Sequence, residues 1–161
     1  MVMATGHRGQ LIGVAIFAVG VAIAVPLFAQ GPEPTADQNC QTQGLTEYQK
    51  AVKANPQSSL AHYCVAVVLF SQELDRPPNW WSGGYQASAN AYRGALHGDG
   101  NPKWTKVWSY IGLGKIFDVT DQRERAVAQY QLAVQTNDNS RGAVDEAREL
   151  LQKPYRLPNN H

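Results

Sequence analysis

Residues 110–133, YIGLGKIFDVTDQRERAVAQYQLA, decide the fold. Large and small residues recur there at the three- and four-residue spacing of a helix face, at Tyr110, Leu113, Gly114 and Phe117 and again at Ala126, Tyr130 and Ala133. Between the two sets, Asp121 precedes Glu124 by three residues, which resembles a capping box that opens a second helix. We therefore expect an antiparallel helix pair in which Gly114 faces Ala126, because larger side chains would push the helices apart.

The flanking sequence continues the helical pattern and shows no convincing strand alternation. A first helix carries Leu45, Tyr48, Ala51 and Val52 on one face and closes at Asn55-Pro56, where Pro56 suits the first turn of the next helix. Further helices are expected over 60–70, over 87–96, after Asn101-Pro102 to about 117, and from a Ser140 cap to about 152. The sequence thus predicts an all-α fold of about six helices.

This order of large and small residues resembles the tetratricopeptide repeat (TPR), a helix pair of 34 residues. Weaker copies of the pattern lie at Tyr48, Ala51 and Pro56, at His62, Val65, Ala66 and Leu69, and at Ser88, Tyr92 and Ala95. The resemblance implies a short α-solenoid of stacked antiparallel pairs over residues 40–152. Its packing positions would be Ala66, Tyr92, Ala95, Gly114, Ala126, Tyr130 and Ala133.

The family usually binds ligands in a concave groove lined by the first helix of each pair. The resemblance places Leu60, Tyr63, Val67, Phe70, Trp108, Ile111, Lys115 and Asp118 in that groove. A mostly apolar groove suits an amphipathic helix or an apolar strip of a protein partner. Lys115 alone offers a cation, so the carboxylate clamp of the chaperone-binding relatives is not expected. An equally weighted alternative is that the chain's own Tyr155, Arg156 and Leu157 fill the groove.

Trp80 and Trp81 stand side by side in the insertion between two of the predicted helices. The simplest interpretation is that both pack inside the protein. Alternatively, one of them anchors a partner, since tryptophan is enriched at binding hot spots, or an indole face stacks on a sugar.

Residues 1–29 read as an export signal. A short start with Arg8 precedes the apolar run LIGVAIFAVGVAIAV and a small residue, Ala29, which is typical of a cleaved signal peptide. Residues 11–28 are also just long enough for a retained membrane anchor. Residues 30–39 form a polar spacer and 153–161 a C-terminal tail. We expect a location in the periplasm or at the outer face of the cytoplasmic membrane.

Cys40 and Cys64 are the only cysteines. Cysteines in an exported protein usually pair, so a disulfide is the favoured interpretation, with two free thiols as the alternative. The absence of a C-x-x-C spacing argues against a redox role. His62 and Cys64 point to opposite sides of a helix, so no metal site is expected.

No catalytic motif, phosphate-binding glycine loop or cofactor motif occurs in the sequence. The chain holds 14 basic and 13 acidic residues, which gives no electrostatic reason to bind nucleic acid. We therefore expect a non-catalytic exported scaffold that binds a protein partner without a cofactor. One alternative is a membrane-anchored accessory subunit of a larger complex, and a second is a glycan- or peptidoglycan-binding protein.

Overall fold

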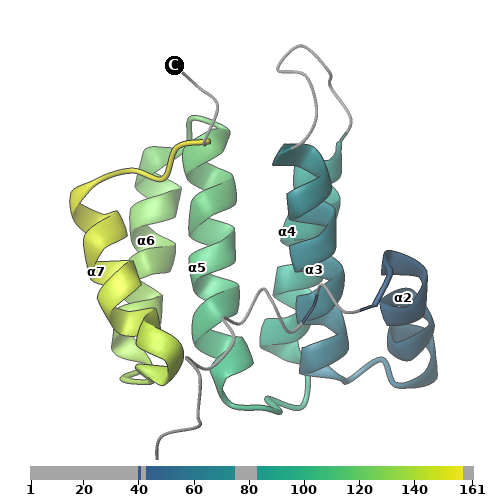
Figure 1. Ribbon diagram of the computed structural model, residues 1–161. Helices are drawn as coiled ribbons and strands as arrows, with labels where there is room; N and C mark the ends of the chain where they lie inside the picture. Colours follow the sequence, from purple (N-terminus) through teal and green to yellow (C-terminus); the bar gives the residue numbers. More distant parts are fainter. Residues whose placement is uncertain (1–39, 41–42, 75–82, 158–161) are drawn as a thin grey trace, which may run out of the picture. The chain divides into compact units, whose positions relative to one another are not determined.

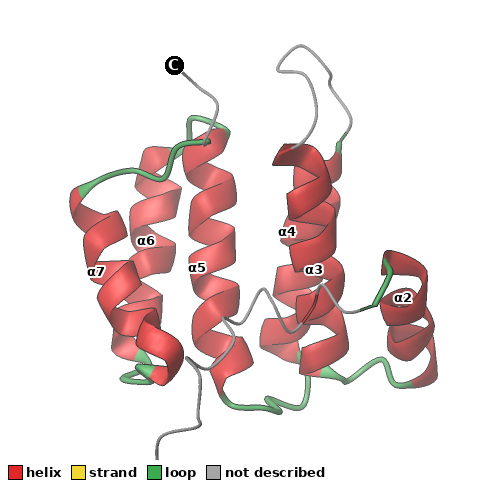
Figure 2. Cartoon of the chain, viewed as in Figure 1, coloured by secondary structure: helices red, strands yellow, loops and turns green. Residues whose placement is uncertain are grey.

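The computed structural model describes Cys40, residues 43–74 and residues 83–157. Six α-helices make up most of this part: α2 (Leu45–Ala54), α3 (Ser59–Leu74), α4 (Gly84–His97), α5 (Trp104–Val119), α6 (Arg123–Gln135) and α7 (Ala143–Gln152), with a short 3₁₀ turn, η1 (Ser140–Gly142), before α7 (Figure 1). No strand occurs within these described ranges (Figure 2). The predicted all-α class with about six helices is confirmed.

Each helix packs against the next one along the chain, from α2 to α7. In addition, α3 contacts α5, and α5 contacts α7 (Figure 1). Apolar side chains from these helices form one core cluster, which runs from Cys40 to Ala147.

Small residues and two serines let α3 and α4 approach closely. Ser88 Oγ in α4 donates a hydrogen bond to the carbonyl oxygen of Ala66 in α3 at 2.7 Å, and Ser59 Oγ in α3 donates to that of Ala95 at 2.8 Å. Both serines and Ala66 are 0% exposed. The two reciprocal bonds satisfy buried hydroxyl groups that would otherwise lose free energy on leaving water.

The seven predicted packing residues are all buried. The nearest neighbour of Gly114, however, is the ring of Tyr130, not Ala126: a Cβ added to Gly114 would lie 2.2 Å from Tyr130 Cε1. Likewise, a Cβ on Gly112 would lie 2.3 Å from Cζ of Tyr92. The two glycines therefore make room for two tyrosine rings that reach α5 from α6 and from α4.

The predicted capping box at Asp121 is wrong. Asp121 adopts a left-handed conformation, with φ of 57°, and belongs to the end of α5. Gln122 N donates to the Phe117 carbonyl at 2.7 Å and Asp121 N donates to that of Asp118 at 3.2 Å, which is the Schellman pattern. Because Asp121 is needed to close α5, Gln122 becomes the residue before α6, and its side chain makes no capping bond.

The cap of α7 is Asn139, not Ser140. Asn139 Oδ1 accepts hydrogen bonds from the backbone nitrogens of Val144 at 2.8 Å and Asp145 at 3.2 Å. Ser140 instead bonds to Asp138. The positive φ of Gly142, 74°, separates η1 from α7 and lets the more distant side chain reach the helix start.

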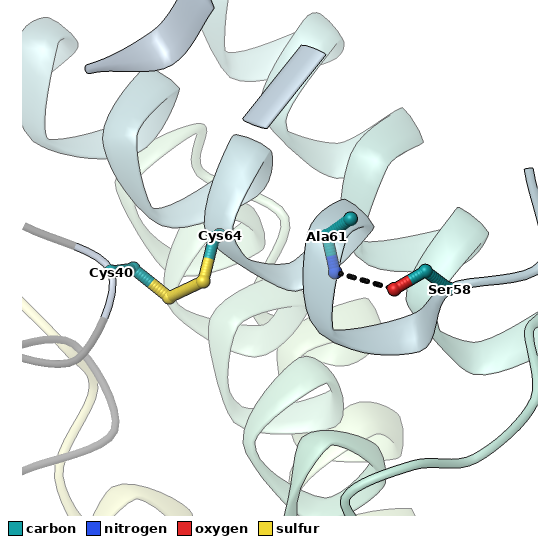
Figure 3. Close-up of a disulfide and its surroundings, with 4 residues drawn as sticks. All are labelled: Cys40, Ser58, Ala61 and Cys64. Carbon is teal, nitrogen blue, oxygen red and sulfur yellow. Dashed lines mark hydrogen bonds between the residues drawn. A yellow bond between two sulfur atoms is a disulfide. The ribbon is translucent and has the colours of Figure 1, made fainter. Parts of the chain in front are cut away.

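Pro56, predicted to lie in the first turn of the next helix, instead precedes that helix. Pro56 sits in a turn, and α3 begins at Ser59. There the backbone nitrogen of Ala61 donates to Ser58 Oγ at 3.2 Å (Figure 3), so Ser58 caps the helix. Pro102 likewise precedes α5, which begins at Trp104.

Candidate partner-binding site

The side chains predicted to line the groove come together between α3 and α5. Spacing of three or four residues places Tyr63, Val67 and Phe70 on one face of α3 and Trp108, Ile111 and Lys115 on one face of α5. These six residues line one cavity of about 140 Å³. Its other lining residues are Ser71, Leu74, Tyr92, Gly112 and Tyr155.

The apolar members of this set are buried within the chain. Their exposed fractions are 1% for Tyr63, 5% for Val67, 8% for Phe70, 7% for Trp108 and 1% for Ile111. A partner can reach these side chains only if a part of the protein that covers them moves. We call this set of cavity-lining residues the α3/α5 face.

The predictions for Leu60 and for the paired tryptophans have different outcomes. Leu60 continues the stripe of α3 toward its N-terminal end, does not line the cavity, and is 38% exposed. Trp80 and Trp81 lie outside the described residues, so their roles stay predictions.

Aromatic rings make up much of the cavity wall. The ring of Tyr63 lies 5.8 Å from that of Tyr92 and 5.2 Å from that of Trp104, both in edge-to-face geometry. At the other end, the Phe70 ring lies 6.2 Å from that of Tyr155. Each of these pairs joins different helices or joins α3 to the C-terminal segment, so the rings hold the face together.

Lys115, the predicted cation of the groove, already interacts with other residues of the chain. Its Nζ lies 2.7 Å from Oε1 of Glu146 in α7 and 5.2 Å from the centre of the Tyr155 ring. The ion pair ties α5 to α7, while the cation lies over the aromatic face.

Asp118 is the polar centre at the end of this face. Its side chain is 1% exposed, and Arg123 Nη1 donates to both of its oxygens at 3.1 Å. Asp118 Oδ2 also accepts hydrogen bonds from the Tyr130 hydroxyl and from the backbone nitrogen of Tyr155, each at 2.8 Å. These donors come from α6 and from the segment after α7.

The surroundings of Asp118 affect the titration of Tyr130, and Arg123 makes further bonds beside its ion pair with Asp118. Burial, followed by the hydrogen bond to Asp118, raises the pKa of Tyr130 above its ordinary value. Arg123 Nη2 donates to the carbonyl oxygens of Leu150 at 2.9 Å and Leu151 at 2.8 Å, which lie in the last turn of α7. One guanidinium therefore joins α5, α6 and α7. Arg123 is not among the residues predicted from the sequence, because nothing near it in sequence signals a bond to residues 27 and 28 positions away.

The predicted disulfide is confirmed. Cys40 and Cys64 are bonded, with Cα atoms 4.8 Å apart, and they are 0% and 2% exposed (Figure 3). The bond joins Cys40, which precedes α2 in the sequence, to Cys64 in α3. Disulfides persist in oxidising compartments, which agrees with an exported protein.

The described ranges hold no group of three His, Cys, Asp or Glu side chains placed to bind a metal ion. His62 instead lies with Nε2 3.0 Å from the Pro56 carbonyl oxygen. Within 43–74 and 83–157, no helix is both long and apolar enough to cross a membrane.

No protein-family model, curated protein sequence or solved structure matches this chain.

Proposed function

We propose that this chain is an exported, non-catalytic helical-repeat protein of the TPR type that binds a protein partner on the α3/α5 face. The main support for this proposal is the contact pattern of the helices. Each helix packs against the next one along the chain, and α3 also packs against α5 and α5 against α7. A solenoid of helix pairs has this contact pattern, because each pair stacks on the following one.

The apolar character of the face supports a protein partner. Its stripe extends along α3 from the exposed Leu60 to the buried Phe70. A continuous apolar strip whose end is exposed suits an apolar strip on another chain better than a polar ligand. The disulfide supports export, since it requires an oxidising environment.

Two exposed leucines provide a matched test. Leu60 in α3 and Leu132 in α6 are each 38% exposed, but only Leu60 continues the stripe of the α3/α5 face. Epitope-tagged full-length chain is purified from its native cells as wild type, Leu60→Glu and Leu132→Glu. A specific partner should be retained by wild type and Leu132→Glu and lost from Leu60→Glu. Retention by Leu60→Glu together with loss from Leu132→Glu would place the binding surface elsewhere and contradict the proposal.

The same preparation tests export. Intact mass of the purified chain from soluble and membrane fractions reports whether residues 1–29 have been removed. A mature chain that begins at Gln30 supports a free exported protein. A full-length, membrane-bound chain would instead favour a retained anchor over residues 11–28.

A further inference from the structure

Residues 153–157, which we call the C-terminal strap, form no helix or strand, and through Tyr155 they reach the α3/α5 face. Lys153 leaves α7 in an extended conformation, with φ of −130° and ψ of 119°. The strap then places the Tyr155 ring in the wall of the 140 Å³ cavity. It directly follows α7, so no further segment separates it from the helix that positions it.

The strap is held by contacts that an extended peptide ligand would use. The main-chain nitrogen of Tyr155 donates to Asp118 Oδ2 at 2.8 Å. Its ring lies 6.2 Å from that of Phe70 and 5.2 Å from Lys115 Nζ. Burial, Glu73 and, as the smallest contribution, Tyr155 raise the pKa of Tyr85 in α4. One aromatic side chain thus joins the strap to α3 and α5.

Charge complements these contacts. A surface depression of about 640 Å³ is lined by acidic residues of α7 and by the strap's two cations: Asp145, Glu146, Glu149, Lys153 and Arg156. The basic residues of the strap therefore flank its tyrosine next to an acidic helix face.

We propose that the C-terminal strap is an intramolecular competitor for the partner, which presents an extended segment with an aromatic side chain flanked by basic residues. This inference rests on the proposed function, because it assumes that the α3/α5 face receives a partner. A segment tethered this closely has an effective concentration on the order of millimolar, so it would block weak ligands while allowing a stronger one to displace it.

The test measures binding of a fluorescein-labelled peptide with the strap sequence KPYRL and blocked ends to the full chain. Three proteins are compared by fluorescence anisotropy: wild type, Tyr155→Ala, and Leu157→Ala as a control within the strap. We expect Tyr155→Ala to bind the peptide at least tenfold more tightly than wild type, because its own ring no longer competes. Leu157→Ala should behave as wild type, and the peptide KPARL should bind none of them. Higher salt should weaken the binding.

Equal affinity of wild type and Tyr155→Ala would overturn the proposal, as would a folded Tyr155→Ala that fails to bind. If Tyr155→Ala does not fold, NMR of wild-type protein with ¹³C-labelled tyrosine gives the answer. Peptide at several millimolar should move the Tyr155 ring signals to their free positions, whereas unchanged signals under that excess would refute competition. A concentration-dependent dimer that Tyr155→Ala abolishes would identify a second copy as the occupant and also refute the proposal.

Failure here is distinguishable from failure of the proposed function. If the peptide does not bind but Leu60→Glu still loses its partner, the partner uses the exposed end of the face and only the competitor inference falls. If the peptide binds but no partner depends on Leu60, the surface is a peptide site and the proposed partner-binding function falls.

Discussion

The guanidinium of Arg123 contacts both carboxylate oxygens of Asp118 at 3.1 Å, at a position where the Asp118 side chain is 1% exposed and that of Arg123 is 33% exposed. The pair joins α5 to α6, and through the bonds of Arg123 to Leu150 and Leu151 it also secures the end of α7. The strap starts there, so this ion pair sets where Tyr155 lies.

Asp118→Asn should lower the free energy of unfolding by about 2–3 kcal/mol, because removing one partner leaves the other charge partly buried without compensation. Urea unfolding followed by circular dichroism measures the change. The control is Glu47→Gln, whose ion pair with Lys50 is 56% and 67% exposed on the two sides. Glu47→Gln should lower the free energy of unfolding by less than about 1 kcal/mol. Equal losses of unfolding free energy in the two variants would show that the buried ion pair of Asp118 stabilises the protein no more than an exposed one.

Gly114→Ala should destabilise the protein by about 1–3 kcal/mol, since overpacking outweighs the better helix propensity of alanine. The added Cβ would lie 2.2 Å from Tyr130 Cε1. Thermal unfolding of a double-mutant cycle with Tyr130→Ala isolates the clash. In the Tyr130→Ala background, Gly114→Ala should become neutral or stabilising. An unchanged cost in that background would mean that the ring is not the cause.

Replacement by alanine should have different effects on stability at two buried serines. Ser88→Ala removes the bond to the Ala66 carbonyl and should cost about 1 kcal/mol. Ser109 is 0% exposed, and its hydroxyl has no hydrogen-bond partner among the described residues. Ser109→Ala should therefore be neutral or slightly stabilising, since the buried hydroxyl contributes a desolvation cost without a bond. Chemical denaturation of both variants measures the two losses of stability. A larger loss for Ser109→Ala than for Ser88→Ala would contradict the role of the Ser88 hydrogen bond between α3 and α4.

Stability should fall above pH 10 partly because of Tyr130. Its pKa is raised in the folded protein from an ordinary value of 10.0, so its contribution is complete below pH 10 and is lost as the pH rises, when the unfolded chain releases the proton more readily. Tyr130→Phe should show a shallower decline than wild type between about pH 10 and 12. The comparison uses urea midpoints across that range, and parallel curves for the two proteins would argue against the assignment.

Loss of the Cys40–Cys64 bond should lower stability by about 3 kcal/mol, in the range expected for a crosslink that restricts the unfolded chain. The bond spans a sequence separation of 24. Cys40→Ala/Cys64→Ala and wild type are compared in urea, with and without reductant. Reductant should affect wild type alone. A double variant as stable as the oxidised wild type would show that the bond does not contribute.

Periodicity predicted the helices well but not their ends. The apolar run over 60–70 lies inside α3 (Ser59–Leu74), because burial on several sides demands such a run. The ends depend on which nearby polar group reaches a free backbone group. At α7, Asn139 reaches across η1 and displaces Ser140 as the cap, and sequence spacing alone does not reveal that geometry.

The sequence predicted which side chains share one face of α3, but not that other parts of the chain cover them. The spacing of Tyr63, Val67 and Phe70 placed them on one face, and the structure brings them into one cavity with α5. The place of Tyr155 beside Phe70 depends on how α7 ends. That position is held by Arg123 through contacts between residues far apart in sequence.

Photo-crosslinking in native cells tests the partner-binding claim most directly. A photoreactive amino acid replaces Ser71, which lines the cavity of the α3/α5 face, or Leu132, which is exposed on α6. We expect one partner chain to become crosslinked from position 71 and not from position 132. Crosslinks to that chain from position 132 alone would contradict binding on the α3/α5 face.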